Sequence, residues 1–156
     1  MKSSTAGKVM GVIILFISLV VLPIFYISIV DWREDSNRIQ IASRDFIDRA
    51  IDAGQVTSDM EADLNLDLAA CTGNFVYTIT VETKITNPKF DDSGNVVGYT
   101  TVWVPIAYKK GDTLQRGDII TLTVEQSDFG LFQKFAIGLL GVSFNKMDCV
   151  TPGMVR

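Results

Sequence analysis

The longest uncharged segment of the chain, residues 9–30, reads VMGVIILFISLVVLPIFYISIV and restricts the fold more than any other feature. A helix rises about 1.5 Å per residue, so a segment of this length crosses the roughly 30 Å hydrocarbon core of a bilayer. Pro23 would be costly inside a water-exposed helix, but membrane helices tolerate proline as a kink. We therefore predict a transmembrane helix over residues 9–30, because a chain of 156 residues is too small to bury such a helix on all sides.

The residues on either side of this segment predict its orientation. Lys2 and Lys8 precede the segment, whereas several acidic residues and Trp32 follow it. Positive charge in a short flanking segment stays in the cytoplasm, and aromatic residues such as Tyr26 and Trp32 favour the membrane interface. Residues 1–8 are therefore expected to be a cytoplasmic leader, with the chain beyond the helix outside the cytoplasm. A cleaved secretory signal is disfavoured, because the apolar segment exceeds the usual length of about 7–15 residues and no A-x-A-like site follows it.

Composition excludes several classes of function. The chain is 47% hydrophobic, which argues against a disordered tail, and its net charge of −4 would repel nucleic acid. Histidine is absent, which removes His-dependent catalytic triads and His-ligated zinc or haem sites. The sequence contains no G-x-S-x-G nucleophile context and no phosphate-binding Gly-Lys loop. We therefore expect a protein that is not an enzyme, with no catalytic residues, no cofactor and no metal.

Helical periodicity continues beyond the membrane segment. Apolar residues recur at helical spacing after residue 31: Ile39, Ala42, Phe46, Ala50 and Ala53. Gly54 is a plausible stop for this amphipathic helix. One helix from the membrane to residue 53, or two helices broken near Asp31, would both fit the local sequence. A shorter helix is expected to begin at Thr57 or Ser58, to bury Met60, Leu64 and Leu68, and to end at the turn formed by residues 72–74.

From residue 75 the apolar period changes from helical to alternating. Five apolar residues share one face of the first predicted strand: Phe75, Tyr77, Ile79, Val81 and Ile85. Asn87 and Pro88 are expected to end this strand, and residues 91–95 to form a turn. Further strands are predicted at residues 96–108 and 119–124, with Pro105 at an edge or bulge, and a meander is the simplest topology.

The apolar segment 129–144 is too short to cross a bilayer and contains Lys134. It is expected to form a packed helix or loop that leads into a last strand near residues 141–147. Contact with the membrane surface is the open alternative. The predicted fold class is therefore α+β: a leader at 1–8, a transmembrane helix at 9–30, an amphipathic helical region at 31–74, and an antiparallel sheet domain at 75–156.

Three small motifs are candidate sites. Cys71 and Cys149 are expected to form a disulfide in an oxidising compartment, although both would also serve as separate small apolar residues. Oxygen ligands at residues 91–95 resemble a calcium loop only weakly, because the distal glutamate of an EF-hand is missing. The adhesion tripeptide at residues 116–118 also reads as an ordinary turn before a strand.

The order of these parts resembles a known family. The segments that carry the likeness are RDFIDRA at 44–50, GQVT at 54–57, LAACTG at 68–73, FVYTITV at 75–81 and RGDIITLTV at 116–124. In pattern and order they resemble the small TadE-like minor pilins or pseudopilins of tight-adherence (Flp, type IV-related) systems and related pilin-like membrane proteins of Gram-positive bacteria. Typical type IV pilins carry a glutamate near the fifth position after a processing glycine, whereas Lys-Val-Met-Gly-Val follows Gly7 here.

This resemblance implies a non-enzymatic subunit or assembly component of a cell-surface filament or secretion apparatus, anchored in the cell membrane. The implied partners are membrane lipid and other pilin-like subunits, with no nucleic acid. Gly7 and Gly11, at small-xxx-small spacing, and Phe46 are candidates for helix packing, although glycine is also common in membrane helices generally. The alternative function is a single-pass, membrane-anchored extracellular binding module that uses the sheet and its loops.

Overall fold

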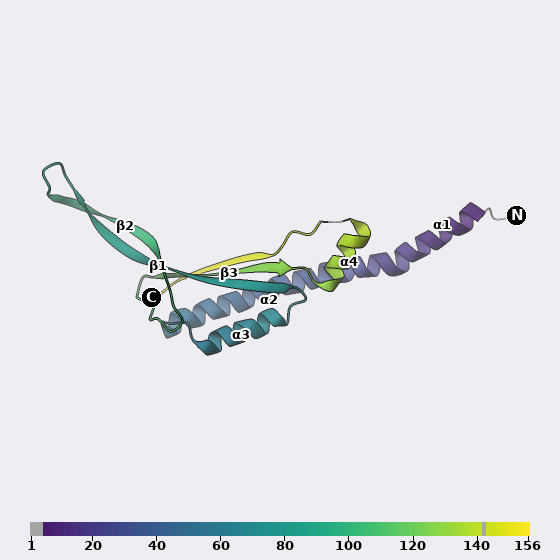
Figure 1. The fold of residues 1–156 in the computed structure, drawn as a ribbon, viewed down its shortest axis with the longest axis horizontal. Coiled ribbons are helices and arrows are strands. Elements are labelled where there is room, and N and C mark those ends of the chain that lie inside the picture. The colour runs from purple at the N-terminus through teal and green to yellow at the C-terminus, as the bar shows by residue number, and fades with distance from the viewer. Residues whose placement is uncertain (1–4, 142) are drawn as a thin grey trace.

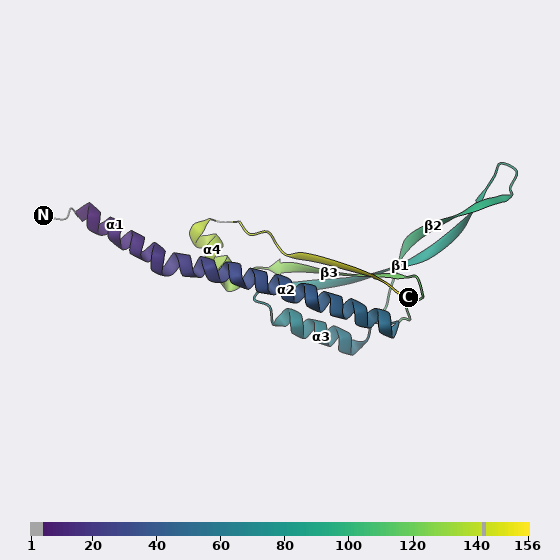
Figure 2. The same cartoon turned by 180° about the vertical axis from the view of Figure 1, so that it is seen from behind.

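A single long helical rod dominates the structure, a computed structural model that describes residues 5–141 and 143–156. The rod consists of α1 (Thr5–Phe16), a short π-helical segment η1 (Ile17–Val21), and α2 (Leu22–Ala53). Figures 1 and 2 show these segments in continuous succession, with the free end of α1 far from the rest of the protein. Helix α2 passes through Asp31 without interruption, so of the two alternatives the single helix is confirmed. Lys2, part of the expected leader, lies outside the described residues.

The π-helical segment has a local cause. Pro23 lies at the beginning of α2, directly after η1. A proline donates no backbone hydrogen bond, and its ring collides with the carbonyl group four residues earlier. Widening the preceding turn to a π-helical geometry accommodates the ring without ending the helix. The helix therefore continues past the proline without ending.

The helices end where the sequence predicts. Gly54 caps α2 in the left-handed region at φ 63°, where the missing side chain avoids a steric penalty. Helix α3 (Ser58–Ala69) begins after Thr57, whose hydroxyl oxygen accepts a hydrogen bond from the backbone N–H of Met60. The expected inner residues of α3, namely Met60, Leu64 and Leu68, are buried.

Four antiparallel strands form one sheet: β1 (Asn74–Phe90), β2 (Val96–Ile106), β3 (Ile119–Asp128) and β4 (Asp148–Met154). Their order is β2-β1-β3-β4, so the predicted meander is wrong. The cause is the length of β1, which has two different neighbours along its course. Residues 74–82 pair with β3, whereas residues 81–90 pair with β2.

Two predicted strand boundaries also need correction. Asn87 and Pro88 do not end β1, which pairs with β2 as far as Phe90. Beyond Glu82 this strand has a neighbour on one side only, and proline is tolerated on such an edge. The last strand is not near residues 141–147: α4 (Leu131–Leu140) ends at Gly141, at φ 64°, and β4 begins at Asp148.

The core lies between the sheet and one side of the helices. Val81, Ile120, Leu122 and Val124 point from the sheet toward a buried row on α2. That row consists of Ile39, Ala42, Phe46, Ile47 and Ala50. The predicted helical stripe is thus correct as far as Ala50, but Ala53 is exposed. Helices α2 and α3 lie side by side beneath the sheet (Figure 2), and the fold class is α+β as predicted.

The far halves of β1 and β2 leave the body of the protein as a two-stranded projection, residues 83–106, which we call the hairpin arm (Figure 1). Its turn is formed as predicted, because Asp91 Oδ1 accepts hydrogen bonds from the backbone N–H groups of Ser93 and Asn95. The exposed large apolar residues of the arm are Ile85, Phe90, Val96, Val97, Tyr99, Val102, Trp103, Val104 and Ile106. Ile85, predicted to belong to the inner face, is therefore wrongly assigned, since no helix extends beneath the arm.

A buried carboxylate ties α2 to the corner between α3 and the sheet. Asp35 is 4% exposed, and its oxygens accept hydrogen bonds from the backbone N–H of Thr72 at 3.1 and 3.2 Å. The Thr72 hydroxyl also donates to Asp35 Oδ2. Buried charged groups are stable only when hydrogen-bonded or paired, so this contact fixes where the chain leaves α3.

We predict that Asp35→Ala destabilises the folded domain by about 1–3 kcal/mol, because it removes the charged acceptor of the hydrogen bonds from the Thr72 N–H and hydroxyl groups. The measurement is urea unfolding of the full chain in detergent, followed by near-ultraviolet circular dichroism. Glu34→Ala, at the exposed neighbouring position, is the control and should change the midpoint little. Equal midpoints for the two variants would contradict a stabilising role for Asp35.

Candidate membrane and assembly surface

The first half of the helical rod has an apolar surface that the rest of the chain does not cover. The segment Gly7–Ala53 is one helix that is long and apolar enough to cross a membrane. Between residues 9 and 30, Val21 and Ser28 are the buried side chains. Exposed large side chains on the remaining surface include Val12, Ile13, Ile14, Leu15, Phe16, Leu19, Leu22 and Tyr26. An apolar surface of this size requires either lipid or another apolar protein surface.

The helix-packing candidates fall into two groups. Gly11 lies on the uncovered surface, and a Cβ atom added there would meet no atom within 4 Å. Gly7 is also exposed, one helical turn earlier. Phe46, in contrast, is 2% exposed and packs in the core of its own domain. Phe46 is therefore covered by its own domain, whereas Gly11 lies on the exposed surface.

Helix α4 packs against α2 close to where α2 begins (Figures 1 and 2). The buried side chains of α4 are Gln133 and Ala136, and those nearest the beginning of α2 are Val21 and Ser28. The hydroxyl group of Ser28 donates to the carbonyl oxygen of Ile24, one turn earlier in its own helix. Small or internally bonded side chains thus let the two helices approach closely.

A pair of buried glutamines attaches α4 to the sheet. Gln126 Nε2 donates to Gln133 Oε1 at 3.3 Å, and the same oxygen accepts from the Gly130 N–H at 3.0 Å. Gln126 Oε1 in turn accepts from the Met147 N–H at 3.2 Å. A Cβ atom at Gly130 would lie 2.8 Å from the Thr72 carbonyl oxygen, so only glycine fits there. These contacts fix the position of α4 relative to β3 and to the residues that precede β4.

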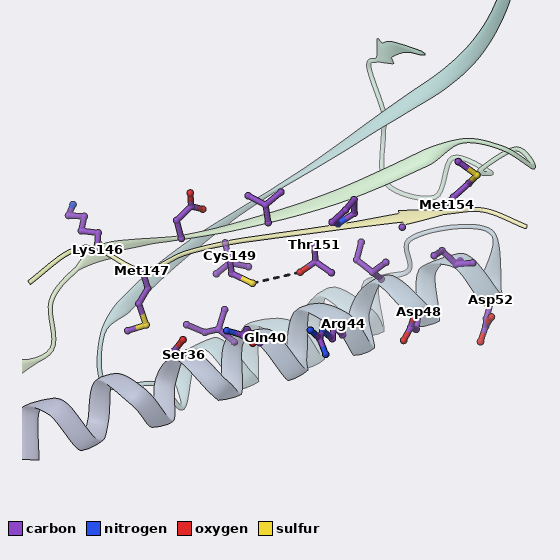
Figure 3. A pocket seen from close by; sticks show the side chains of 18 of the residues that line it. Ser36, Gln40, Arg44, Asp48, Asp52, Lys146, Met147, Cys149, Thr151 and Met154 are labelled. Atoms are coloured by element: carbon purple, nitrogen blue, oxygen red, sulfur yellow. Dashed lines mark hydrogen bonds between the residues drawn. The ribbon is translucent and has the colours of Figure 1, made fainter. Parts of the chain in front are cut away.

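A groove of about 1120 Å³ separates α2 from β4, the edge strand of the sheet (Figure 3). Five residues spaced four apart line its α2 side: Ser36, Gln40, Arg44, Asp48 and Asp52. Met147, Cys149 and Thr151 line the β4 side. The charged lining combines Arg44, Lys146 and Arg156 with Asp48, Asp52 and Asp148, so the groove does not favour ligands of one sign of charge.

Within the groove, β4 approaches α2 closely at Gly153. A Cβ atom at Gly153 would lie 2.4 Å from Ile47 Cγ2 and 2.6 Å from Ile51 Cδ1. Any larger residue would therefore push the edge strand away from the helix. Pro152, beside this contact, removes a backbone donor from the strand edge, which weakens this edge as a template for strand addition.

The predicted disulfide between Cys71 and Cys149 is not formed, and both cysteines are free. Cys71 lies near Asp35, and its thiol donates to the carbonyl oxygen of Asp67 at 3.5 Å. Cys149 Sγ lies 4.0 Å from the hydroxyl oxygen of Ser43. Asp35 and Ser43 are about 12 Å apart along the helix axis, whereas a disulfide requires Cα atoms within roughly 7 Å.

The thiol of Cys71 is poorly ionised. Partial burial, followed by the nearby charge of Asp35, raises the pKa of this thiol to about 11. Because the thiolate is the nucleophile in thiol chemistry, a pKa this high suppresses reactivity near neutral pH. The local environment therefore fits a structural cysteine better than a catalytic or redox-active one.

The adhesion tripeptide has a structural role. Asp118 is 3% exposed, and its carboxylate accepts hydrogen bonds from the Thr83 hydroxyl at 2.7 Å and the Gln115 N–H at 2.8 Å. These bonds fix the base of the hairpin arm to the start of β3. Gly117 has φ 95°, which the turn requires. The tripeptide thus cannot present its carboxylate to a receptor.

Metal-ligating groups do not cluster in the part of the chain that the structure describes: no group of three or more Cys, Asp or Glu residues is placed to hold an ion there. The residues at 91–95 form a hydrogen-bonded turn instead. Sequence reasoning did not single out three buried polar residues, namely Asp35, Gln126 and Gln133. In the sequence, each is only a polar residue at a position where an apolar pattern continues. Such a residue does not show which group its side chain will bond.

Comparison of the chain with protein-family models, curated proteins and solved structures finds no match.

We predict slow alkylation of Cys71 in the Cys149→Ser variant at pH 8. Raising the pKa from 9.0 to about 11 reduces the thiolate fraction roughly 100-fold, and the greater nucleophilicity of a more basic thiolate offsets part of this. The folded protein should react about tenfold more slowly with iodoacetamide than the urea-unfolded protein. Its rate should rise about tenfold between pH 9 and pH 10, whereas a rise of only about twofold, as a thiol of pKa 9.0 would give, would contradict the raised pKa.

Proposed function

We propose that this chain is a non-enzymatic, pilin-like subunit or assembly component of a cell-surface filament or secretion apparatus. Its rod-shaped helix anchors it in the cell membrane, with the cytoplasm on the side of α1 and the sheet domain outside. The partners are membrane lipid and other pilin-like subunits. The TadE-like pattern of the sequence supports this proposal, and so does the architecture.

The continuity of the helix is the observation that carries the proposal. Residues 39–50 of α2 bury one row of side chains in the domain core, whereas most of the surface of residues 9–20 is covered by nothing in the chain. A flexible linker between these halves would let the domain move independently of its anchor. One uninterrupted helix instead couples the position of the domain to the position of the membrane segment. Such coupling is what a subunit requires when helix packing sets the spacing of its domains.

The mechanism follows from the apolar surface. In the bilayer, the first half of the rod is in contact with lipid chains. During assembly, contact with neighbouring helices replaces contact with lipid at little hydrophobic cost, since both surroundings are apolar. The strength of association then depends on how closely the helices pack. The small residues Gly7 and Gly11 would let two helix backbones approach each other closely. No chemical step is required of the chain.

We predict that Gly11→Leu weakens self-association of the full chain in lipid vesicles about tenfold, because the new side chain keeps two backbones apart. Association is measured by energy transfer between labelled copies as the ratio of lipid to protein changes. The fold should survive, since a side chain at this position meets no neighbour in the subunit and leucine favours helix over glycine. Gly138→Leu is the matched control, because Gly138 is also a helical glycine with open space around it. Equal association for both variants would contradict packing through Gly11.

A membrane-anchored binding module is the second candidate, and the hairpin arm favours it. Two-stranded hairpins are marginally stable alone, yet this arm exposes large apolar residues at its tip and along its length. A partner that covers these residues would stabilise the arm. In this role the helix would serve only as an anchor.

An arm-shortened variant separates the two candidates. Replacing residues 86–101 with an Asn-Gly turn keeps the cross-strand pair of Ile85 and Val102. If the chain is an assembly subunit that packs through its helix, this variant keeps the self-association that Gly11→Leu weakens. If the chain is a binding module, the shortened variant loses its attachment to the partner surface and Gly11→Leu has no effect.

A further inference from the structure

Helix α4 lies beside a segment of the rod that belongs to the membrane span. Among the buried side chains at this junction, Val21 and Ser28 both fall within residues 9–30. With a rise of about 1.5 Å per residue, Val21 lies about 14 Å inside the end of the span at residue 30. Because α4 packs against α2 near its beginning (Figure 2), a bilayer around residues 9–30 would have α4 at the depth of its outer leaflet and not above its surface.

The outward surface of α4 is mostly apolar. Its inward side carries Gln133 and Ala136, which are buried. Its exposed large apolar residues, between 41% and 65% exposed, are Leu131, Phe132, Phe135 and Leu139, and Lys134 and Gly138 are exposed as well. Leu22 and Tyr26, in the first turns of α2, are exposed as well. Exposed apolar residues thus occur on α4 and on the part of α2 near which it packs, although about 100 residues of sequence separate Tyr26 from Leu131.

The polar side chains of α4 are bonded within the protein, except that Gln133 Nε2 is buried without a hydrogen-bond partner. Lys134 is the one charged residue between Leu131 and Leu140, and it forms an ion pair with Asp128. The Gly130 N–H, at the beginning of the helix, is bonded to the side chain of Gln133. The helix ends at Gly141, whose N–H donates to the carbonyl oxygen of Ile137. Pairing of the lysine lowers the cost of placing such a helix in the interfacial region of a bilayer.

We infer that α4 is a second membrane element, a half-helix that lies in the outer leaflet with Leu131, Phe132, Phe135 and Leu139 in contact with lipid chains. This inference rests on the proposed anchoring of the rod in the membrane. Ten residues of helix span about 15 Å, which suits a helix embedded in one leaflet and not a second crossing. The bilayer surface then lies near Trp32 and the ion pair of Lys134 with Asp128. The sheet domain is consequently attached to the membrane at two points, which restricts its tilt and its rotation about the rod.

Site-directed spin labels in the full chain test this inference. In a Cys71→Ser, Cys149→Ser background, single cysteines replace Val12, Phe135, Leu139 or Leu66, all of which are exposed, so the label displaces no packed side chain. The labelled proteins are reconstituted into phosphatidylcholine and phosphatidylglycerol vesicles. Power saturation then compares access to oxygen, which concentrates in lipid, with access to a water-soluble nickel chelate. Leu66 on α3, 70% exposed, is the matched apolar control outside the membrane.

Labels at 135 and 139 are expected to favour oxygen as the label at 12 does, and the label at 66 to favour nickel. Nickel access at 135 and 139 with oxygen access at 12 would overturn the inference while the anchor stands. Nickel access at 12 as well would overturn the proposed anchoring together with the inference. Low access to both reagents at 135 and 139 would place α4 against another protein chain and overturn its contact with lipid.

A second measurement avoids the cysteine substitutions. Benzoylphenylalanine in place of Phe135 in the otherwise unchanged chain is illuminated in the same vesicles, and the product is weighed by mass spectrometry. A phospholipid adduct is expected. A protein dimer without lipid adduct would contradict the inference.

Discussion

The structure depends on one constraint: a single helix must satisfy two different surroundings along its length. Its second half is amphipathic and is covered on one side by the sheet and on another by α3. Its first half is apolar around most of its circumference, and α4 packs near the end of this half, close to where α2 begins. Since apolar surface of this extent is unfavourable in water at roughly 25 cal/mol per Å², the rod requires lipid or neighbouring helices. Because the helix is continuous, the position of the whole domain depends on where the first half of the rod lies.

The contacts between the domain and the rod are distributed along the rod. Near Gly54, the close approach of Gly153 to Ile47 and Ile51 fixes the edge strand on the helix. Midway, Asp35 bonds to Thr72 and fixes the corner between α3 and β1. Near the beginning of α2, α4 packs against the rod, and Gln126 and Gln133 hold α4 to the sheet. Attachment at three levels makes the domain follow the orientation of the rod, which suits a subunit whose position is set by helix packing.

Local signals in the sequence predicted most of the elements. Met60, Leu64 and Leu68 share a helical period, Gly54 supplies a left-handed stop, and Asp91 bonds its own turn, so each was predictable from neighbouring residues. The order of the strands was not predictable, because it depends on β1 being shared between β2 and β3. The alternation at Ile85 is the same as at Val81, although only Val81 has a helix beneath it. The cysteines were misjudged for a related reason, since spacing in sequence does not show which part of α2 each one contacts.

Cysteine scanning across residues 9–16 in native membranes tests the central claim most directly, namely that the rod both anchors the chain and joins it to its neighbours. Each cysteine is introduced singly with Cys71 and Cys149 replaced by serine, and disulfide-linked dimers are measured after mild oxidation. The account predicts yields that rise and fall with the helical period of about 3.6 residues, with a maximum on the side of Gly7 and Gly11. Uniformly low yields along the segment would show a helix surrounded by lipid alone and would contradict assembly through the rod.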